Sequence, residues 1–161
     1  MDEILEILEK NSKYTEEEIA VMTGKTCEEV KAAIKKYEGD KVIVGYTTLI
    51  NWEKTTKESV VALIEVKVTP QRGEGFDKVA KRIYKFPEVK ACYLMSGGFD
   101  LTVIVESKTM KDVALFVAEK LAAQESVLST STHFVLKKYK DEGTIFEERV
   151  YDDREAVIIW T

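Results

Sequence analysis

The sequence has few of the residues that build metal centres, disulfide frameworks or catalytic dyads. It contains two cysteines, one histidine and two prolines. Cys27 and Cys92 stand alone and far apart, which fits no zinc motif. The single histidine, His133, has no nucleophile that the sequence places beside it. We therefore expect no catalytic residue, no metal site and no cofactor.

Long apolar runs are also missing. No stretch approaches the roughly 18 apolar residues of a membrane span. The first residues, MDEILEILEK, are acidic and differ from a secretion signal. At 161 residues, with 45% hydrophobic and 33% charged residues, the chain has the size and composition of one or two small soluble domains. We expect a cytoplasmic protein with no membrane partner.

The most informative segment covers residues 15–38, TEEEIAVMTGKTCEEVKAAIKKYE. Thr15 with Glu18, and Thr26 with Glu29, have the spacing of a capping box, in which a Thr hydroxyl and a Glu carboxylate each accept a backbone N–H at the start of a helix. Gly24 lies between these two helix starts, where a tight turn needs positive φ. The pattern predicts a helix-turn-helix and points to DNA, and the alternative is an ordinary helical hairpin, which can carry the same Thr caps and Gly turn.

Apolar residues at helical spacing predict a small core shared by three helices. The predicted core residues are Ile4, Leu5, Leu8, Ile19, Met22, Val30, Ile34 and Tyr37. Gly39 and Asp40 end the third helix, and residues 42–50 (VIVGYTTLI) are rich in β-branched side chains, which predicts a strand or wing. Residues 1–50 are thus predicted to form a winged helix-turn-helix domain.

The outward face of the third helix is the predicted DNA contact, with a solvated charged face as the alternative. Residues 1–50 carry seven Lys against eleven Asp plus Glu, and no arginine lies on this helix. Most contacts would therefore go from lysines to phosphates, although Glu28 can accept from a cytosine amino group. The predicted DNA-binding residues are Thr26, Cys27, Glu28, Lys31, Ala32, Lys35 and Lys36.

The pattern changes after a polar linker at residues 51–59. Residues 60–140 alternate between strand and helix patterns in the order βαββαβ, with Gly97 and Gly98 between the two middle strands. This order predicts an α+β ferredoxin-like sandwich. Residues 141–161 form a C-terminal extension whose run AVIIW is predicted to add a strand.

The first strand of the sandwich is apolar on both faces. Val60, Ala62, Ile64 and Val66 alternate onto one face, but Val61 and Leu63 make the other face apolar as well. Both helices of a ferredoxin-like fold lie on one side of its sheet, so the second face needs another cover. A homodimer would provide it.

In this order, the helix-turn-helix, the segment VIVGYTTLIN and the segment MSGGFDLTVIV resemble the Lrp/AsnC (feast/famine) transcription regulators over roughly residues 1–139. The resemblance implies a regulator that dimerises, assembles further into tetramers or octamers, and responds to amino acids bound where dimers meet. The sequence departs from the family at Ala32 and Ala33, where members often carry basic residues.

The segment SGGFD is the candidate effector site. Its glycines expose backbone N–H groups to an anion and Asp100 can hold a cation, and an amino acid presents both charges. From the residues alone, an ordinary hairpin turn is the better interpretation; the resemblance favours the site and adds three hydroxyls on the last strand. The full set is Ser96, Gly97, Gly98, Phe99, Asp100, Thr130, Ser131 and Thr132.

Two alternative functions stay open. Sirohaem decarboxylases look like the same architecture used for tetrapyrrole chemistry, and would be expected to offer histidines to the iron, of which only His133 is present. The other alternative is a ligand-binding protein whose acidic head no longer binds DNA.

Overall fold

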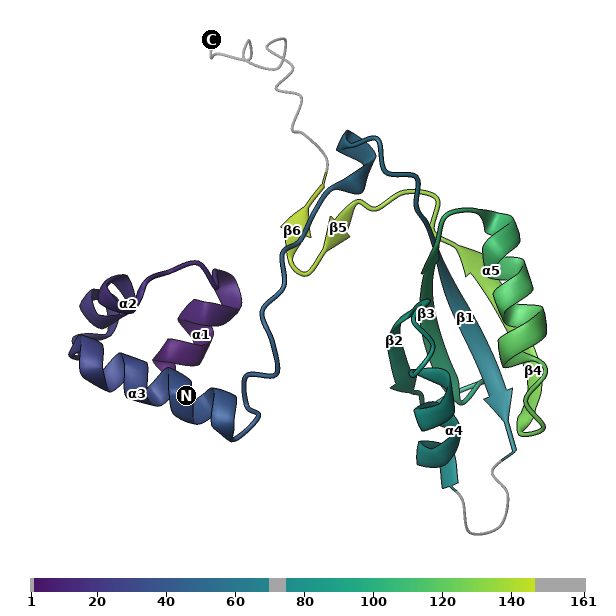
Figure 1. The fold of residues 1–161 in the computed structure, drawn as a ribbon, viewed down its shortest axis with the longest axis horizontal. Coiled ribbons are helices and arrows are strands. Elements are labelled where there is room, and N and C mark those ends of the chain that lie inside the picture. The colour runs from purple at the N-terminus through teal and green to yellow at the C-terminus, as the bar shows by residue number, and fades with distance from the viewer. Residues whose placement is uncertain (1, 70–74, 147–161) are drawn as a thin grey trace, which may run out of the picture. The chain divides into compact units, whose positions relative to one another are not determined.

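The computed structural model describes residues 2–69 and 75–146. The chain divides into two compact units, Met1–Ile50 and Asn51–Thr161 (Figure 1). We call the first unit the head. The four-stranded sheet of the second unit and the two helices that cover it are called the sandwich.

The head contains three helices, α1 (Glu3–Lys10), α2 (Glu16–Thr23) and α3 (Cys27–Gly39). Both predicted capping boxes form. The Thr26 hydroxyl accepts from the Glu29 N–H at 3.2 Å, and the Glu29 carboxylate accepts from the Thr26 N–H at 2.8 Å. Gly24 ends α2 in the left-handed region with φ 66°, as the turn requires. The predicted helix-turn-helix is confirmed.

A small core holds the three helices of the head together. Its buried members are Ile4, Ile19, Ala20 and Val30, and the half-buried side chains of Leu8, Ile34 and Tyr37 are among those that pack against them. The prediction for Met22 was wrong, because its side chain is 53% exposed. The buried stripe of the short helix α2 runs through the adjacent pair Ile19 and Ala20, and this leaves Met22 on the solvent side.

The strand predicted over residues 42–50 was also wrong. The N–H groups of Val42 and Ile43 donate to the Tyr37 carbonyl at 2.8 and 3.1 Å, and so close the C-terminal end of α3. Residues 44–50 then run without regular secondary structure. A β-rich composition makes a strand only where a neighbouring strand accepts its hydrogen bonds, and none of the strands in the described residues pairs with this segment.

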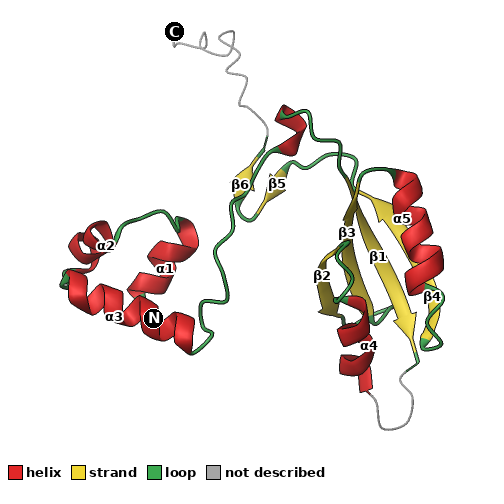
Figure 2. Ribbon diagram, in the orientation of Figure 1, coloured by secondary structure: helices red, strands yellow, loops and turns green. Residues whose placement is uncertain are grey.

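The sandwich has the predicted βαββαβ order: β1 (Val60–Val68), α4 (Gly75–Ile83), β2 (Val89–Leu94), β3 (Leu101–Ser107), α5 (Met110–Phe116) and β4 (Val127–Phe134) (Figure 2). A π-helical turn, η2 (Val117–Leu121), continues α5. The strands form an antiparallel sheet in the order β2-β3-β1-β4, so the ferredoxin-like α+β fold is confirmed.

The core of the sandwich lies between one face of the sheet and the two helices. Alternate residues of β1, including Ile64 and Val66, are fully buried beside Val103 of β3. Helix α4 adds Val79 and Ile83, and α5 adds Val113 and Phe116. Both helices therefore cover the same face of the sheet, as Figure 1 shows. We call the opposite face the outer sheet face.

Residues 51–59 are attached to the sandwich by polar contacts. They begin with a short 3-10 helix, η1 (Trp52–Lys54). Further on, the Lys57 ammonium donates to the Glu106 carboxylate at 2.7 Å, and the Ser59 hydroxyl donates to the same oxygen at 2.8 Å. These two contacts hold the pKa of Glu106 below its usual value.

The chain after β4 forms a small hairpin from β5 (Lys140–Asp141) and β6 (Thr144–Ile145). The predicted strand in the run AVIIW lies outside the described residues. No helix within residues 2–69 and 75–146 is long and apolar enough to cross a membrane.

Candidate functional site

The outward face of α3 is built by the same pattern that buries its inner face. Val30 is fully buried and Ile34 and Tyr37 are half-buried, so the residues on the opposite side of the helix point to solvent. Five of the seven predicted DNA-binding residues are exposed there: Glu28, Lys31, Ala32, Lys35 and Lys36. They form one continuous surface along the helix.

The other two predicted residues have local roles at the start of α3. The Thr26 hydroxyl accepts the Glu29 N–H and donates to the Glu29 carboxylate at 3.1 Å. Cys27 is half-buried and packs against the core of the head. Thr26 is exposed, so its side chain combines this capping role with access to solvent, whereas Cys27 is the less accessible of the two.

The charge of α3 is balanced. Its three lysines stand against Glu28, Glu29 and Glu38. Hydrogen bonds from the Thr26 N–H and hydroxyl lower the pKa of Glu29. Lysine ammonium groups act as point charges and lack the planar fork with which arginine reads guanine. The face is therefore suited to phosphate contacts more than to base reading.

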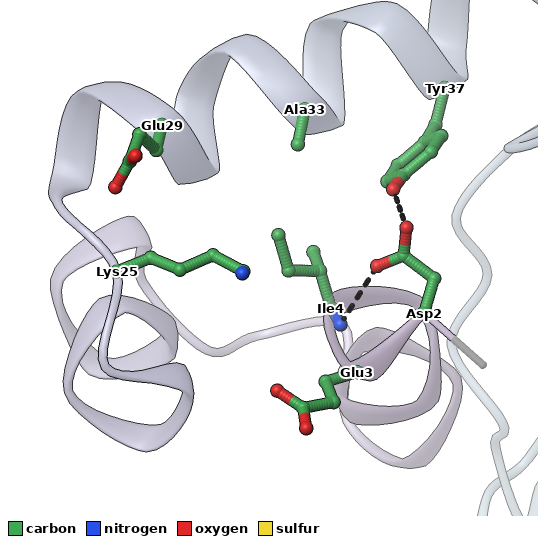
Figure 3. A pocket seen from close by; sticks show the side chains of 7 residues that line it. All are labelled: Asp2, Glu3, Ile4, Lys25, Glu29, Ala33 and Tyr37. Atoms are coloured by element: carbon green, nitrogen blue, oxygen red, sulfur yellow. Dashed lines mark hydrogen bonds between the residues drawn. The ribbon is translucent and has the colours of Figure 1, made fainter.

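A hollow in the head lies on the flank of α3 that faces α1, away from the outward lysines. Ala33 and Tyr37 line it from α3, and Lys25 extends into it from the turn before α3 (Figure 3). The Tyr37 hydroxyl donates to the Asp2 carboxylate and so connects the end of α3 to the start of α1. The hollow contains none of the residues predicted for DNA or effector binding.

The second candidate site is the loop of residues 95–100 between β2 and β3, which we call the effector loop. Its last residue, Asp100, is bonded to the end of β1. The Asp100 carboxylate accepts from the Val68 N–H at 2.8 Å, and the Asp100 N–H donates to the Val66 carbonyl at 3.1 Å. One oxygen of Asp100 therefore has a structural role at the irregularity in β1 between Lys67 and Val68.

The rest of the effector loop is open. Ser96, Gly97 and Gly98 are exposed, Phe99 is half-buried, and Gly97 has φ 148°, a conformation that favours glycine. Thr130 of β4 pairs with Val66, the same residue that Asp100 contacts from the other side. Asp100 and Thr130 thus flank the end of β1.

The three predicted hydroxyls of β4 do not meet. Strand alternation turns the half-buried Thr130 and Thr132 toward the helices, because they pair with Val66 and Ile64 of the core. Ser131 points to the outer sheet face, where its hydroxyl lies 3.3 Å from His133 Nε2. Period-two alternation in the sequence was a sufficient signal for this separation.

The outer sheet face carries apolar side chains that neither helix covers. Val61 and Leu63 were anticipated there, and Leu63 lies opposite Ile104 of β3, which sequence reasoning missed. On its other side, Leu63 pairs with His133 of β4. The His133 Nε2 atom is 3.4 Å from the Glu65 carboxylate. The described residues contain no group of three or more His, Cys, Asp or Glu side chains placed to hold a metal ion.

Comparison with known proteins gives one family. The model of the Lrp/AsnC ligand binding domain matches residues 61–145. The uncharacterized HTH-type transcriptional regulator YugG of Bacillus subtilis (strain 168) is 51% identical over 98% of this chain and 94% of its own length. The HTH-type transcriptional regulator FL11 of Pyrococcus furiosus is 29% identical over 86% of this chain and 88% of its own length.

Solved structures show the same fold. The transcriptional regulator NMB0573 of Neisseria meningitidis, in complex with L-Met, has a TM-score of 0.71 at 23% identity, over 86% of this chain and 89% of that one. AsnC of E. coli has a TM-score of 0.65 at 18% identity, over 84% and 89%. The relatives above are named as transcriptional regulators, which favours a regulator over an enzyme of similar architecture. The chain belongs to the Lrp/AsnC family of transcriptional regulators.

Proposed function

We propose that this regulator binds double-stranded DNA through α3, acts as a homodimer joined through the outer sheet face, and changes its assembly when an amino acid binds at the effector loop. The observation that carries the proposal is the outward lysine face of a helix whose start is fixed by a capping box. Helical spacing places these lysines on one side of α3. A capped helix packed on a core presents them together.

Binding to DNA is expected to be modest for one head and stronger for several. Three lysines on α3 supply few phosphate contacts, and Glu28 and Glu29 oppose them. Two heads joined in one dimer convert the second contact into an intramolecular event, which raises the overall affinity. This argues for linked heads as the unit that reads an operator.

A gel shift with the DNA upstream of its own gene tests this part. The full chain should retard the DNA and Lys35→Glu should abolish the shift, because the change reverses a charge at the centre of the face. The control is Glu9→Lys, which changes the net charge by the same amount in the opposite direction. Glu9 is exposed on α1 and lies outside the α3 face, so this variant should still retard the DNA. If the parent gives no shift, the head does not bind DNA, and the second candidate, a ligand-binding protein, takes its place. If Lys35→Glu shifts the DNA as well as the parent does, the contact is not made through the outward face of α3.

The homodimer is supported by the uncovered apolar residues of the outer sheet face. Val61, Leu63 and Ile104 form its centre, and the half-buried Glu65 lies beside them. A second copy packed sheet to sheet would remove these side chains from water at roughly 25 cal/mol per Å² of apolar surface. Sedimentation of the full chain measures the oligomeric state and so tests the proposed dimer.

An amino acid fits the chemistry of the effector loop. Asp100 uses one carboxylate oxygen for Val68 and keeps the other for an ammonium group, while the loop glycines leave backbone N–H groups open to a carboxylate. The Neisseria meningitidis neighbour is described as a complex with L-Met, which supports an amino acid as the class of ligand. Thr130 is the β4 hydroxyl best placed to assist.

Isothermal titration of the full chain with each of the amino acids tests the effector. At least one should bind, and Asp100→Asn should weaken binding by removing the charge while it keeps an oxygen for Val68. Glu119→Gln, an exposed carboxylate on η2, serves as the matched control. Absence of binding for every amino acid, or equal binding by Asp100→Asn, would contradict the assignment.

A further inference from the structure

Helix α4 carries a basic stripe along its outward side. Val79 and Ile83 face the core and are buried, whereas Lys78, Lys81 and Arg82 are exposed. Their spacing of i, i+3 and i+4 places the three cations on one side of the helix. We call them the α4 stripe; Lys85 extends it in the turn that follows the helix.

The stripe stands out against the charge of the whole chain. The protein has a formal net charge of −5. Three cations adjoin in the stripe, and they outnumber Asp77, the one acidic residue of the helix, which lies four residues before Lys81 and therefore on the same side. Arg82 is the only arginine within residues 2–69 and 75–146. Arginine binds phosphate oxygens with two parallel N–H donors, a contact that the lysines of α3 cannot make.

The stripe lies on a different face of the sandwich from the proposed dimer interface. Helix α4 lies on the face of the sheet opposite the outer sheet face. A homodimer that covers Val61 and Leu63 would therefore not cover the stripe. The stripe and the proposed dimer interface are separate surfaces of the same domain.

We propose that the α4 stripe binds the phosphate backbone of double-stranded DNA; this inference rests on the proposed function. The charge of α3 explains the need, because its three lysines are balanced by three glutamates. Affinity for DNA grows with the number of phosphates that cations neutralise. A row of exposed cations on the sandwich would neutralise further phosphates.

The salt dependence of DNA binding by the full chain tests the inference. Lys81→Glu/Arg82→Glu should lower the slope of log K against log salt by about 2, since each lost phosphate contact lowers it by about 1. The matched control is Lys108→Glu/Lys111→Glu, which reverses two exposed lysines at the start of α5 and changes the net charge equally. The control should keep the parent slope.

The outcomes separate the two proposals. Equal slopes in all three proteins would overturn the stripe, and so would equal losses in both double variants, because net charge alone would then explain them. A smaller assembly of Lys81→Glu/Arg82→Glu in sedimentation would also overturn it, since the stripe would then contact a second copy. Failure of the parent to bind DNA at all would contradict the proposed function itself.

A neutral pair guards against misfolding. Lys81→Gln/Arg82→Gln removes the cations without adding repulsion and should lower the slope by the same amount, with a thermal melt like that of the parent. If the neutral pair keeps the parent slope, then the reversed charges act by repulsion alone and the stripe is not a contact.

Discussion

The head and the sandwich bury their apolar side chains on very different scales. In the described residues, four side chains form the buried core of the head, whereas twelve form that of the sandwich. The head helices have 8, 8 and 13 residues, close to or below the roughly 12 to 15 residues at which isolated helices become marginal. The head therefore depends on its caps and a few side chains, whereas the sandwich has a sheet and a larger core.

The difference in core size bears on which unit carries which proposed site. The sandwich gives the proposed dimer interface and the proposed effector site a firm base, because its sheet pairs distant parts of the chain. The head presents a charged helix and leaves apolar side chains such as Val21 at 84% exposure. If one head binds DNA weakly, as proposed, linking two heads through the sandwich raises the overall affinity.

The largest effect is expected from a matched pair of core truncations. Ile19→Ala in the head and Ile64→Ala in the sandwich each remove a fully buried side chain and should each cost about 2 to 5 kcal/mol of local stability. In the head, we expect this cost to exceed the free energy of unfolding that the small core provides. Ile19→Ala should abolish DNA binding while the sandwich still melts near the parent temperature. Calorimetry should show that each substitution affects the unfolding of its own unit. If either substitution abolished the unfolding transitions of both units together, the division into two units would be contradicted.

A smaller effect is expected at Asp100, where the frame meets the effector loop. Asp100→Ala leaves the Val68 N–H without its acceptor and should lower the stability of the sandwich by about 1.5 to 3 kcal/mol. Asp100→Asn should recover much of this loss because its amide oxygen can accept the same bond. Chemical denaturation of the three proteins is the measurement. An unchanged midpoint for Asp100→Ala would show that the bond from the Val68 N–H to Asp100 does not stabilise the sandwich.

The cap of α3 should matter by about 0.5 to 2 kcal/mol. Thr26→Ala removes the acceptor for the Glu29 N–H, and Thr26→Ser keeps it. Because the core of the head is small, this loss should appear as weaker DNA binding. Thr109→Ala, which removes the equivalent cap of α5, should leave DNA binding unchanged. Equal DNA affinity in the parent and Thr26→Ala would show that the head stays folded without this cap, and therefore that its small core is sufficient for stability.

The smallest effect is a pH dependence in the sandwich. The bonds from Lys57 and Ser59 lower the pKa of Glu106, so they stabilise the fold above the usual carboxyl pKa near 4.5 and are lost as pH falls through the lowered value. Glu106→Gln should flatten the decline in stability below about pH 5. Melting temperatures measured from pH 6 to pH 3 provide the test, and an unchanged decline would assign it to other carboxylates such as Glu88.

Local patterns in the sequence were sufficient for the elements that local chemistry decides. The Thr-x-x-Glu spacings predicted both caps of the head, and alternating apolar residues predicted the buried face of β1. The strand expected over residues 42–50 failed because a strand depends on a partner that composition does not reveal. Met22 failed because a two-turn helix can bury either of two neighbouring stripes.

Long-range contacts could not be anticipated. The bond between Asp100 and the Val68 N–H joins residues 32 positions apart, and only the sheet brings them together. The separation of Ser131 from Thr130 and Thr132 was predictable in principle, since neighbouring residues of a strand point to opposite faces. For the effector loop, the sequence thus supplied the residues and the fold decided which of them can act together.

The most direct test of the account is the DNA affinity of a monomeric variant. Leu63→Glu places a charge at the centre of the outer sheet face, far in sequence from α3, and should yield a monomer in sedimentation with an intact thermal transition of the sandwich. If linked heads read DNA, fluorescence anisotropy should show a loss of about 100-fold or more in affinity, within the range that linkage supplies. A monomer that binds DNA as tightly as the parent would contradict the account.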